Sequence, residues 1–589
     1  MRRKIISSVL ACLLTIGTVI GNGVVASAAD SMTVDCNSVI RGVTHCANGS
    51  LYGITENTPY DINEFVAPLH PYVLRNPARG GNGNQHPYGD AIKVARRLSS
   101  VPSARVSIDL ADMLPYWPYR WPGMNGWLNQ VRSFINDKKA SGCNNWYGYE
   151  IWNEPDGTFK NNGVSFEEMW KQTYGLIKSL DPHEKIIGPC DSWYNGNRMR
   201  SFLQYCKANN CIPDIMSWHE LSGLAGVSSH IREYRSLERE LGIRELPISI
   251  NEYCDPNHDL EGQPGSSARF IGKFERYKID SATISWWFTG APGRLGSLLA
   301  TDTQKGAGWY FYKWYGDMSG NMVNVIPPND NSDRVDGAAC VDKNKKYVSF
   351  IFGGPNDGTI NTTFRNIPSF ISSKAKVTIE KIDWVNKDAV SYGPRTISSS
   401  VYNVVNGQIT VSMPNCNASS GYRIYITNAD DTQNSGSQQQ DRPVQDIQSG
   451  AIYKLINRNS GKALGVGYDS TQNGANVIQW YENGQTSQLW KITYTGNGYK
   501  ITNVNANKEL DVEKISVDDG ANIDLWQDNG QTNQRWNIRK NNDGYYILEN
   551  INSGKVLDVE KASNEDGANV IQWYLNNGYN QQWRLVRVN

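Results

Sequence analysis

The chain carries the sequence YEIWNEPD at residues 149–156, in which a short β-run ends on Glu154 and is broken by Pro155. A second stretch, PISINEY at residues 247–253, has the same form, because its β-branched run ends on Glu252. A glutamate at the C-terminal tip of a barrel strand projects its carboxyl group into the mouth of the barrel. The two stretches therefore predict a parallel β-barrel with two carboxyl groups at one end.

Around these two stretches, between residues 36 and 318, β-branched runs alternate with amphipathic segments, which is typical of βα units and a parallel sheet. Eight strands are predicted, at Val39–Gly42, Tyr72–Arg75, Arg105–Asp109, Gly148–Trp152, Lys185–Gly188, Ile215–Trp218, Pro247–Asn251 and Ala282–Trp286. Helical patterns separate them, beginning with the short segment Asp61–Leu69 and ending with Trp309–Asp317. Eight such units close into a (β/α)8 barrel of TIM type, which we expect over residues 29–320.

The chain changes character twice after the predicted barrel. Residues 321–428 contain short alternating runs broken by Gly, Asn and Pro, which predicts an antiparallel all-β sandwich. We find no catalytic constellation in it and expect a structural domain packed on the barrel. Residues 429–447 are rich in Gln, Ser and Asp, so they are expected to form a flexible linker.

The remaining residues, 448–589, contain three internal repeats. A Gln-x-Trp triplet recurs about every 46 residues, at 488–490, 534–536 and 581–583, and Gly-Ala-Asn recurs in register at 474–476, 520–522 and 567–569. Three copies of this length with short strands and Asn/Gly turns predict an all-β trefoil. The fold class is therefore multidomain: a TIM barrel, an all-β sandwich and an all-β trefoil.

The N-terminal 28 residues have the order of a secretory signal peptide. Arg2, Arg3 and Lys4 precede the uncharged run from Ile5 to Ile20, and the small residues of 26–28 follow. A membrane-spanning helix, the alternative, needs a longer apolar stretch. We expect residues 1–28 to be removed and the protein to be secreted.

Charge and cysteine content exclude several partners. The 58 basic and 58 acidic residues balance, so nothing points to nucleic acid or to a membrane surface. Nine cysteines follow the signal segment, and an odd number leaves at least one unpaired; Cys206 and Cys211 are the closest local pair. No Cys-x-x-Cys spacing occurs among them, so we expect no zinc site, and no other metal or cofactor is required.

Composition and the two glutamates point to carbohydrate chemistry. The chain has 19 Trp and 31 Tyr, whose flat faces stack on sugar rings but also fill protein cores. Glycoside hydrolysis needs two carboxyl groups across the scissile bond, and in retaining enzymes they lie about 5–5.5 Å apart. Glu154 and Glu252 are candidates for this pair.

These motifs resemble glycoside hydrolase clan A, in which Asn-Glu ends the fourth strand and a nucleophilic Glu ends the seventh. The resemblance implies that Glu154 is the general acid/base and Glu252 the nucleophile, and that Asn153 binds the substrate 2-hydroxyl. It also implies that Arg75, which ends the second predicted strand, keeps the nucleophile ionised. The barrel followed by a sandwich resembles families 39, 30 and 51, and Asn-Glu-Pro-Asp favours family 39. That family implies β-xylosidase, arabinosidase or related activity on plant-wall polysaccharide.

Other residues at the strand ends are also candidates. His219 ends the sixth predicted strand and is expected either to orient Glu252 or to contact substrate. Trp286 and Trp287 end the eighth strand, and alternation predicts that one of them points inward as a sugar platform. The competing carboxylates are Glu150, Asp109, Asp112, Glu220 and Asp255. The aromatic loop of residues 116–122 is a further candidate for leaving-group subsites.

The three repeats resemble the ricin-type lectin fold, also called carbohydrate-binding module family 13. The resemblance implies that the Gln-x-Trp tryptophans are core and that each repeat binds sugar through an Asp, an aromatic platform and an Asn-Gln pair. The matching residues are Asp511, Trp526, Asn533 and Gln534 in the second repeat, and Asp558, Tyr574, Asn580 and Gln581 in the third. In the first repeat Gly465 and Ser487 replace the Asp and the Asn, so we expect that site to be weak or inactive.

Taken together, the sequence predicts a secreted retaining glycoside hydrolase that acts by double displacement on a xylan or arabinoxylan type of hemicellulose. The lectin module would hold the enzyme on its polysaccharide or oligosaccharide substrate. One alternative keeps the mechanism but takes a glucan, galactan or mannan as substrate. Another is a lectin whose barrel is inactive. The oligomeric state cannot be read from the sequence.

Overall fold

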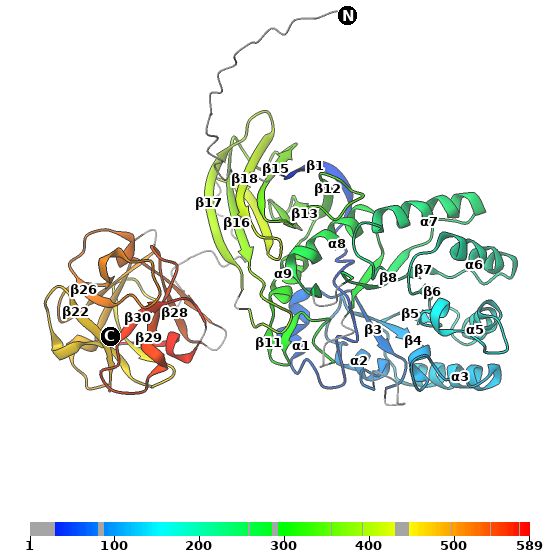
Figure 1. Cartoon of the computed structure of the whole chain (residues 1–589), viewed down its shortest axis with the longest axis horizontal. Coiled ribbons are helices and arrows are strands. Elements are labelled where there is room, and N and C mark those ends of the chain that lie inside the picture. The colour runs from blue at the N-terminus through cyan, green and yellow to red at the C-terminus, as the bar shows by residue number, and fades with distance from the viewer. Residues whose placement is uncertain are drawn as a thin grey trace, which may run out of the picture. The chain divides into compact units, whose positions relative to one another are not determined.

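The computed structural model describes residues 30–80, 87–256, 260–285, 292–354, 356–391, 393–429, 447–495, 498–541, 544–576 and 578–588. The chain divides into two compact units, residues 1–434 and 435–589 (Figure 1). The predicted signal peptide and nearly all of the predicted linker lie outside the described residues.

A closed barrel of eight parallel strands forms the core of the first unit. Its strands are β2 (Ser50–Leu51), β3 (Val73–Pro77), β4 (Arg105–Asp109), β5 (Trp146–Glu150), β6 (Ile186–Asp191), β7 (Ile215–Trp218), β8 (Ile248–Tyr253) and β9 (Ser281–Ile284). The surrounding helices are α1 (Ile62–Phe65), α2 (Ala91–Arg97), α3 (Met124–Ala140), α5 (Phe166–Leu180), α6 (Gly196–Ala208), α7 (Val227–Leu241), α8 (Pro264–Arg276) and α9 (Ala307–Gly316). The predicted TIM barrel is confirmed.

The prediction of the first barrel strand was wrong. Val39–Gly42 is part of β1 (Asp30–Gly42), which pairs with β12 (Asn321–Ile326) and with β15 (Gly358–Arg365) in another sheet. Val39 is 56% exposed, whereas a strand of a helix-covered barrel is buried on both faces. The true first strand, Ser50–Leu51, is only two residues long and has no hydrophobic run that a pattern search could find. The barrel therefore begins near residue 50 and not at residue 29.

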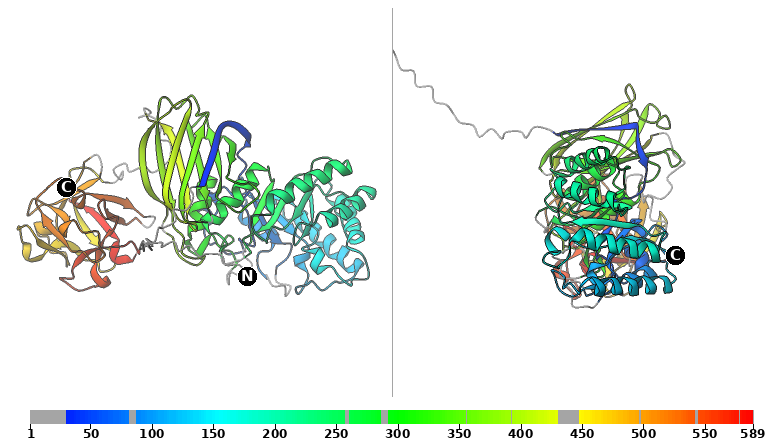
Figure 2. Two further views of the ribbon diagram at one scale, coloured as in Figure 1. Left: turned by 45° about the horizontal axis from the view of Figure 1, so that its top comes forward. Right: turned by 90° about the vertical axis from the view of Figure 1, so that its right-hand side faces the viewer.

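The sandwich domain is built on one nine-stranded sheet that includes β1. The strand order is β17-β16-β19-β14-β13-β12-β1-β15-β18, with β13 (Asp336–Asp342), β14 (Tyr347–Gly353), β16 (Lys374–Ile382), β17 (Arg395–Asn403), β18 (Gln408–Cys416) and β19 (Gly421–Asn428). Figure 2 shows the blue strand β1 beside the green and yellow strands of this sheet. Residues 30–42 therefore belong to the sandwich, which we had expected to begin at residue 321.

The barrel and the sandwich touch through α8. A Cβ atom on Gly272 of α8 would lie 2.6 Å from the carbonyl oxygen of Gly337 on β13, so only glycine allows this approach. The helix is buried along most of its length, because the barrel and the sheet cover opposite sides of it. The sandwich thus covers the side of α8 that would otherwise face solvent.

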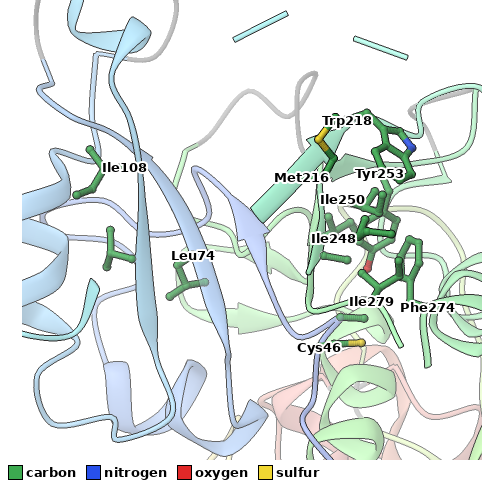
Figure 3. Close-up of a cluster of buried hydrophobic side chains, with 14 of the residues drawn as sticks. Cys46, Leu74, Ile108, Met216, Trp218, Ile248, Ile250, Tyr253, Phe274 and Ile279 are labelled. Carbon is green, nitrogen blue, oxygen red and sulfur yellow. The ribbon is translucent and has the colours of Figure 1, made fainter. Parts of the chain in front are cut away.

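Apolar and polar side chains alternate along the barrel strands. Ile248 and Ile250 of β8 lie in a cluster with Phe274 of α8 and Ile279, outside the barrel wall (Figure 3). The intervening side chains face the other way, since Ser249 bonds to Ser281 at 2.8 Å. Strand alternation therefore places apolar packing under the helices and leaves the interior for polar groups.

The second unit has the predicted trefoil fold, built from twelve short strands between Ala451 and Arg587. Trp490, Trp536 and Trp583 of the Gln-x-Trp triplets are fully buried in its core. Each indole donates a hydrogen bond to a backbone carbonyl oxygen of its own repeat, at 3.0, 3.0 and 3.2 Å. The expectation that these tryptophans are structural is confirmed.

Cysteine pairing and membrane-spanning helices are the remaining features to compare with the sequence predictions. The nine cysteines of the described residues are all free thiols, and eight of them are buried. None of the helices described here has both the length and the apolar character needed to cross a membrane.

Candidate active site

The C-terminal ends of the barrel strands bring the predicted site residues together. Arg75 lies on β3, Asn153 and Glu154 follow β5, His219 follows β7, and Glu252 lies on β8. All except Glu154 are almost completely buried, and the Glu154 side chain is 15% exposed. The carboxyl group of Glu154 therefore lies where the buried cluster meets solvent.

The backbone at Glu154 turns sharply. Its φ of 50° lies in the left-handed region, which non-glycine residues seldom adopt outside strained or functional positions. Its N–H donates to the carbonyl oxygen of Cys190 on β6 at 2.9 Å, and Pro155 begins the short helix α4 (Pro155–Thr158). The break that proline imposes after the strand thus aims the side chain across the barrel mouth.

His219 lies between the two glutamates. Its Nδ1 is 3.1 Å from Oε1 of Glu154, and its Nε2 is 3.6 Å from Oε1 of Glu252. One ligand atom from each of the three residues lies within 4.8 Å of the others. This separation of the carboxyl groups fits a retaining mechanism, in which they lie about 5–5.5 Å apart, better than an inverting one.

Arg75 binds three carboxylates at once. Its guanidinium donates to Glu252 at 2.6 Å, to Glu150 at 2.5 Å and to Asp109 at 2.6 Å. It also donates to the amide oxygen of Asn153 at 2.9 Å, which leaves Nδ2 of Asn153 able to donate to a substrate hydroxyl. The planar fork of arginine satisfies this set, which a lysine ammonium could not do in the same geometry.

Burial and neighbouring charges set the protonation of the cluster. Burial raises the pKa of Glu252, and the positive charges of His219 and Arg75 offset this only in part. Burial alone would lower the pKa of His219, but the charge of Glu252 and the hydrogen bond to Glu154 outweigh it and raise that pKa. Burial alone would also lower the pKa of Arg75. The three neighbouring carboxylates outweigh it and raise that pKa well above its ordinary value. Glu252 therefore depends on its cationic neighbours to remain ionised.

Two buried polar atoms point to the place of the substrate. Oε2 of Glu252 and Nε2 of His219 have no hydrogen-bond partner within the described parts of the chain. Unsatisfied buried polar atoms are costly and therefore rare in folded proteins. Glu252 and His219 both belong to the active-site cluster, so a bound sugar is the natural partner for these two atoms.

The competing carboxylates have structural partners. Glu150 is buried and accepts bonds from Arg75, from Ser107 at 2.6 Å and from Asn251 at 2.7 Å. Asp109 also binds Arg75. Asp112 is held by Tyr52 and Tyr119, Glu220 by Trp218 and His230, and Asp255 by Ser266. The sequence did not reveal the Ser107–Glu150–Asn251 network, because its residues are close only after the barrel closes.

The aromatic candidates differ in outcome. Trp286 and Trp287 lie outside the described residues, so their prediction as sugar platforms stays a prediction. The loop 116–122 turns largely inward: Tyr119 and Trp121 pack against Trp152, whereas Tyr116 is 60% exposed. This loop therefore packs against Trp152, two residues before Glu154, and leaves the ring of Tyr116 exposed.

Within the described residues, Glu154, His219 and Glu252 are also the group whose ligand atoms could gather round a metal ion. Two carboxylates and an imidazole suit several divalent metals. The two-carboxylate reaction does not require one, and the absence of a metal stays a prediction.

The trefoil brings the predicted lectin residues together in two repeats. Asn533 donates to Asp511 at 2.8 Å, and Gln581 donates to Asp558 at 2.8 Å. Gln534 and Asn580 are buried beside them and bond to backbone carbonyls. The rings of Trp526 and Tyr574 are 40% and 53% exposed.

The two predicted aromatic platforms, Trp526 and Tyr574, do not occupy equivalent positions in their repeats. In strand register Trp526 corresponds to Trp573 and not to Tyr574, since Glu509 pairs with Trp526 as Val556 pairs with Trp573. A second carboxylate, Asp524, faces Asp511 across the strands. The corresponding residue is isoleucine in both other repeats.

The first repeat lacks the carboxylate at position 465, as predicted. Ser487 replaces the asparagine, and its hydroxyl donates to Asp469. Asp469 lies four residues after position 465 in the chain. A carboxylate is thus present, but it is exposed and displaced from the position used in the other repeats. The weak or inactive sugar site of this repeat stays a prediction.

Comparison with known proteins agrees with this geometry. Residues 127–244 match the family described as glycosyl hydrolases family 39, and residues 437–526 and 532–589 match the ricin-type beta-trefoil lectin domain-like family. The protein is therefore a glycosyl hydrolase domain joined to a ricin-type lectin domain. It belongs to the same family as N2152 from Neocallimastix frontalis, whose solved structure is 65% identical, with a TM-score of 0.67, over 68% of this chain and 100% of that chain.

Two curated relatives are 24% identical to the chain. One is a 3-O-beta-L-arabinopyranosyl-alpha-L-arabinofuranosidase from Bifidobacterium pseudocatenulatum, and the match covers 71% of this chain and 50% of that protein. The other is a 3-O-alpha-D-galactosyl-alpha-L-arabinofuranosidase from Bifidobacterium longum subsp. longum, with 80% and 46% covered. The chain thus spans about half the length of these curated relatives.

Proposed function

We propose that this protein is a secreted retaining glycoside hydrolase that acts on arabinose- and xylose-containing plant cell-wall polysaccharide of the arabinoxylan type. One observation carries the proposal: Glu154, His219 and Glu252 lie with ligand atoms within 4.8 Å of one another at the C-terminal ends of the barrel strands. The names of both bifidobacterial relatives describe alpha-L-arabinofuranosidases, which supports the choice of sugar.

In the first step, Glu252 attacks the anomeric carbon while Glu154 protonates the glycosidic oxygen of the leaving group. The bond to the leaving group breaks, and a covalent glycosyl–Glu252 ester forms. Arg75 donates to Oε1 of Glu252 and leaves Oε2 free to attack, in agreement with the unpartnered state of that atom in the described chain. Asn153 is placed to bind the hydroxyl next to the anomeric carbon.

In the second step, Glu154 removes a proton from water, and the water oxygen attacks the anomeric carbon. The ester bond to Glu252 breaks, and the sugar leaves with its original anomeric configuration. His219 contacts Glu154 in both steps, and its raised pKa lets it donate from Nδ1 while Glu154 carries negative charge. His219 is thus a positioning residue for the acid/base.

The trefoil is proposed to hold the enzyme on its polymer. Two sugar sites on one module give avidity when both reach the same chain, even where each is weak. Asp511 and Asp558 are the carboxylates that would accept bonds from sugar hydroxyls.

The experiment is hydrolysis of 4-nitrophenyl α-L-arabinofuranoside, 4-nitrophenyl β-D-xyloside and arabinoxylan by the wild type, Glu154→Gln and Glu252→Gln. We expect turnover by the wild type, loss of turnover in Glu252→Gln, and NMR detection of a first product with the substrate's anomeric configuration. Turnover that survives Glu252→Gln, or an inverted first product, would contradict the mechanism. Turnover only on a glucan, galactan or mannan would change the substrate, and no turnover on any glycan would favour a lectin with an inactive barrel.

The proposal of secretion rests on the sequence of residues 1–28. It is checked by N-terminal sequencing of the protein recovered from the medium of a secreting host. We expect a start after Ala28, and retention of the full chain inside the cell would contradict it.

A further inference from the structure

A hollow of about 270 Å³ lies at the N-terminal ends of α6 and α7. The lining residues are Trp193, Tyr194, Asn195, Gly196, Asn197, His230 and Glu233. The helices α6 and α7 lie side by side on the outer side of β6 and β7 (Figure 1). Each helix begins after its strand has ended, so the hollow lies on the same face of the barrel as the C-terminal strand ends. None of these residues takes part in the mechanism above.

One wall of the hollow is bonded to the segment that carries Glu154. The N–H of Glu154 donates to Cys190, and Ser192 donates to Asp156 through its N–H at 2.9 Å and its hydroxyl at 2.6 Å. Trp193 follows Ser192 directly. The backbone of Trp193 therefore begins next to the segment that carries Glu154.

The other wall is bonded to His219 and its neighbour. His219 contacts Glu154, and the next residue, Glu220, accepts a bond from His230 at 2.9 Å. The ring of His230 stacks on Tyr194, with centroids 4.9 Å apart and planes at 20°. The second wall is therefore joined to His219 through the backbone, because Glu220 is the next residue along the chain.

The chemistry of the hollow suits a neutral sugar. Trp193 is 54% exposed, so the flat face of its ring is open to stack on a sugar. Oε1 of Glu233 lies so close to Gly196 that a Cβ there would meet it at 2.0 Å. The carboxylate thus lies at the start of the 13-residue helix α6, where the helix dipole favours its negative charge.

We propose that this hollow is a leaving-group subsite, in which Trp193 stacks on a sugar of the polysaccharide beyond the cleaved bond and Glu233 accepts its hydroxyl bonds. The inference rests on the proposed function, because the leaving group departs on the side of the acid that protonates it, and that acid is Glu154. The hollow then selects an oligosaccharide or polysaccharide over a glycoside with a small leaving group.

The experiment compares two substrates that share the cleaved sugar. One is 4-nitrophenyl α-L-arabinofuranoside, whose leaving group is a single ring, and the other is an arabinoxylan oligosaccharide. For Trp193→Ala we expect kcat/KM on the oligosaccharide to fall about tenfold, mainly through KM, and kcat/KM on the nitrophenyl glycoside to stay within twofold. Trp193→Phe, which keeps a flat ring, should recover most of the loss, and Glu233→Gln should show a smaller loss of the same kind.

The outcomes separate this inference from the function on which it rests. If the wild type cleaves neither substrate, the proposed function fails. If it cleaves both and Trp193→Ala changes neither, or lowers both equally, the function stands and the subsite is refuted. A loss in Trp193→Ala that Trp193→Phe does not recover would also refute the stacking role.

Discussion

Removing the positive charge of Arg75 should shift the pH dependence of the enzyme. Arg75 is fully buried, and its bond to Glu252 is 2.6 Å long. Charge centres about 4 Å apart interact by about 4 kcal/mol at an effective dielectric constant of about 20. Without that interaction the ionised form of Glu252 is less favoured, so in Arg75→Met the pKa of Glu252, already raised by burial, rises further. Glu252 must be ionised to attack, and at pH 5 we expect kcat/KM to fall by several hundredfold or more.

The assay is the pH profile of kcat/KM on 4-nitrophenyl α-L-arabinofuranoside between pH 4 and 9. We expect the acidic limb in Arg75→Met to move toward higher pH and activity to recover in part near pH 9. Arg75→Lys keeps the charge but not the fork, so it should lower kcat while moving the limb much less. Breaking a buried ion pair costs about 3–5 kcal/mol of stability, so both variants are first checked by thermal melting. An unmoved acidic limb in a folded Arg75→Met would refute the argument.

Four further predictions concern single groups. Glu154→Ala should lower kcat on unactivated substrates by about 10²–10⁴-fold, and added azide should restore turnover of a nitrophenyl glycoside with formation of the glycosyl azide; no rescue would contradict the acid/base role. Burial and the charge of Asp511 raise the pKa of Asp524 to about 7. Because the neutral form is favoured in the fold, the stability that Asp524 contributes is present below about pH 4 and lost as the pH rises through about 7. Asp524→Asn should therefore raise the melting temperature of the trefoil at pH 8 but not at pH 4, and equal changes at both would contradict this. Asp511→Ala with Asp558→Ala should abolish retention on insoluble arabinoxylan while leaving nitrophenyl glycoside hydrolysis unchanged. Trp536→Ala should destabilise the trefoil by about 3–5 kcal/mol in denaturant unfolding, because it removes a fully buried ring.

Local sequence was sufficient to find the parts of the site that lie at strand tips. Glu154 and Glu252 were found because both lie at or just beyond the C-terminal end of a barrel strand, where side chains face the barrel mouth. Arg75 and His219 followed from the same rule. The three-fold repeat was equally accessible, since the Gln-x-Trp spacing is periodic.

Features that depend on contacts between distant segments could not be read in this way. Ser50–Leu51 is held in the barrel by its two neighbours, while the stronger pattern of Val39–Gly42 pairs with residues almost 300 positions later. The partners of Glu150, on β4 and β8, are separated from it by 43 and 101 residues. The hollow at Trp193 is made by the loop before α6 and by the first turns of α6 and α7, whose sequences show no motif.

The position of β1 has a consequence for how the chain matures. This strand lies inside the nine-stranded sheet, between β12 and β15, yet it is the first described element of the chain. During synthesis or export it emerges with both of its hydrogen-bonding edges unpaired, and its partners follow only after the whole barrel sequence. An unpaired edge is open to association with other chains, so this interval is when the protein is most prone to aggregate. Once β12 and β15 pair with β1, the strands that precede and follow the barrel lie in one sheet. The barrel and the sandwich then cannot separate unless this sheet is broken.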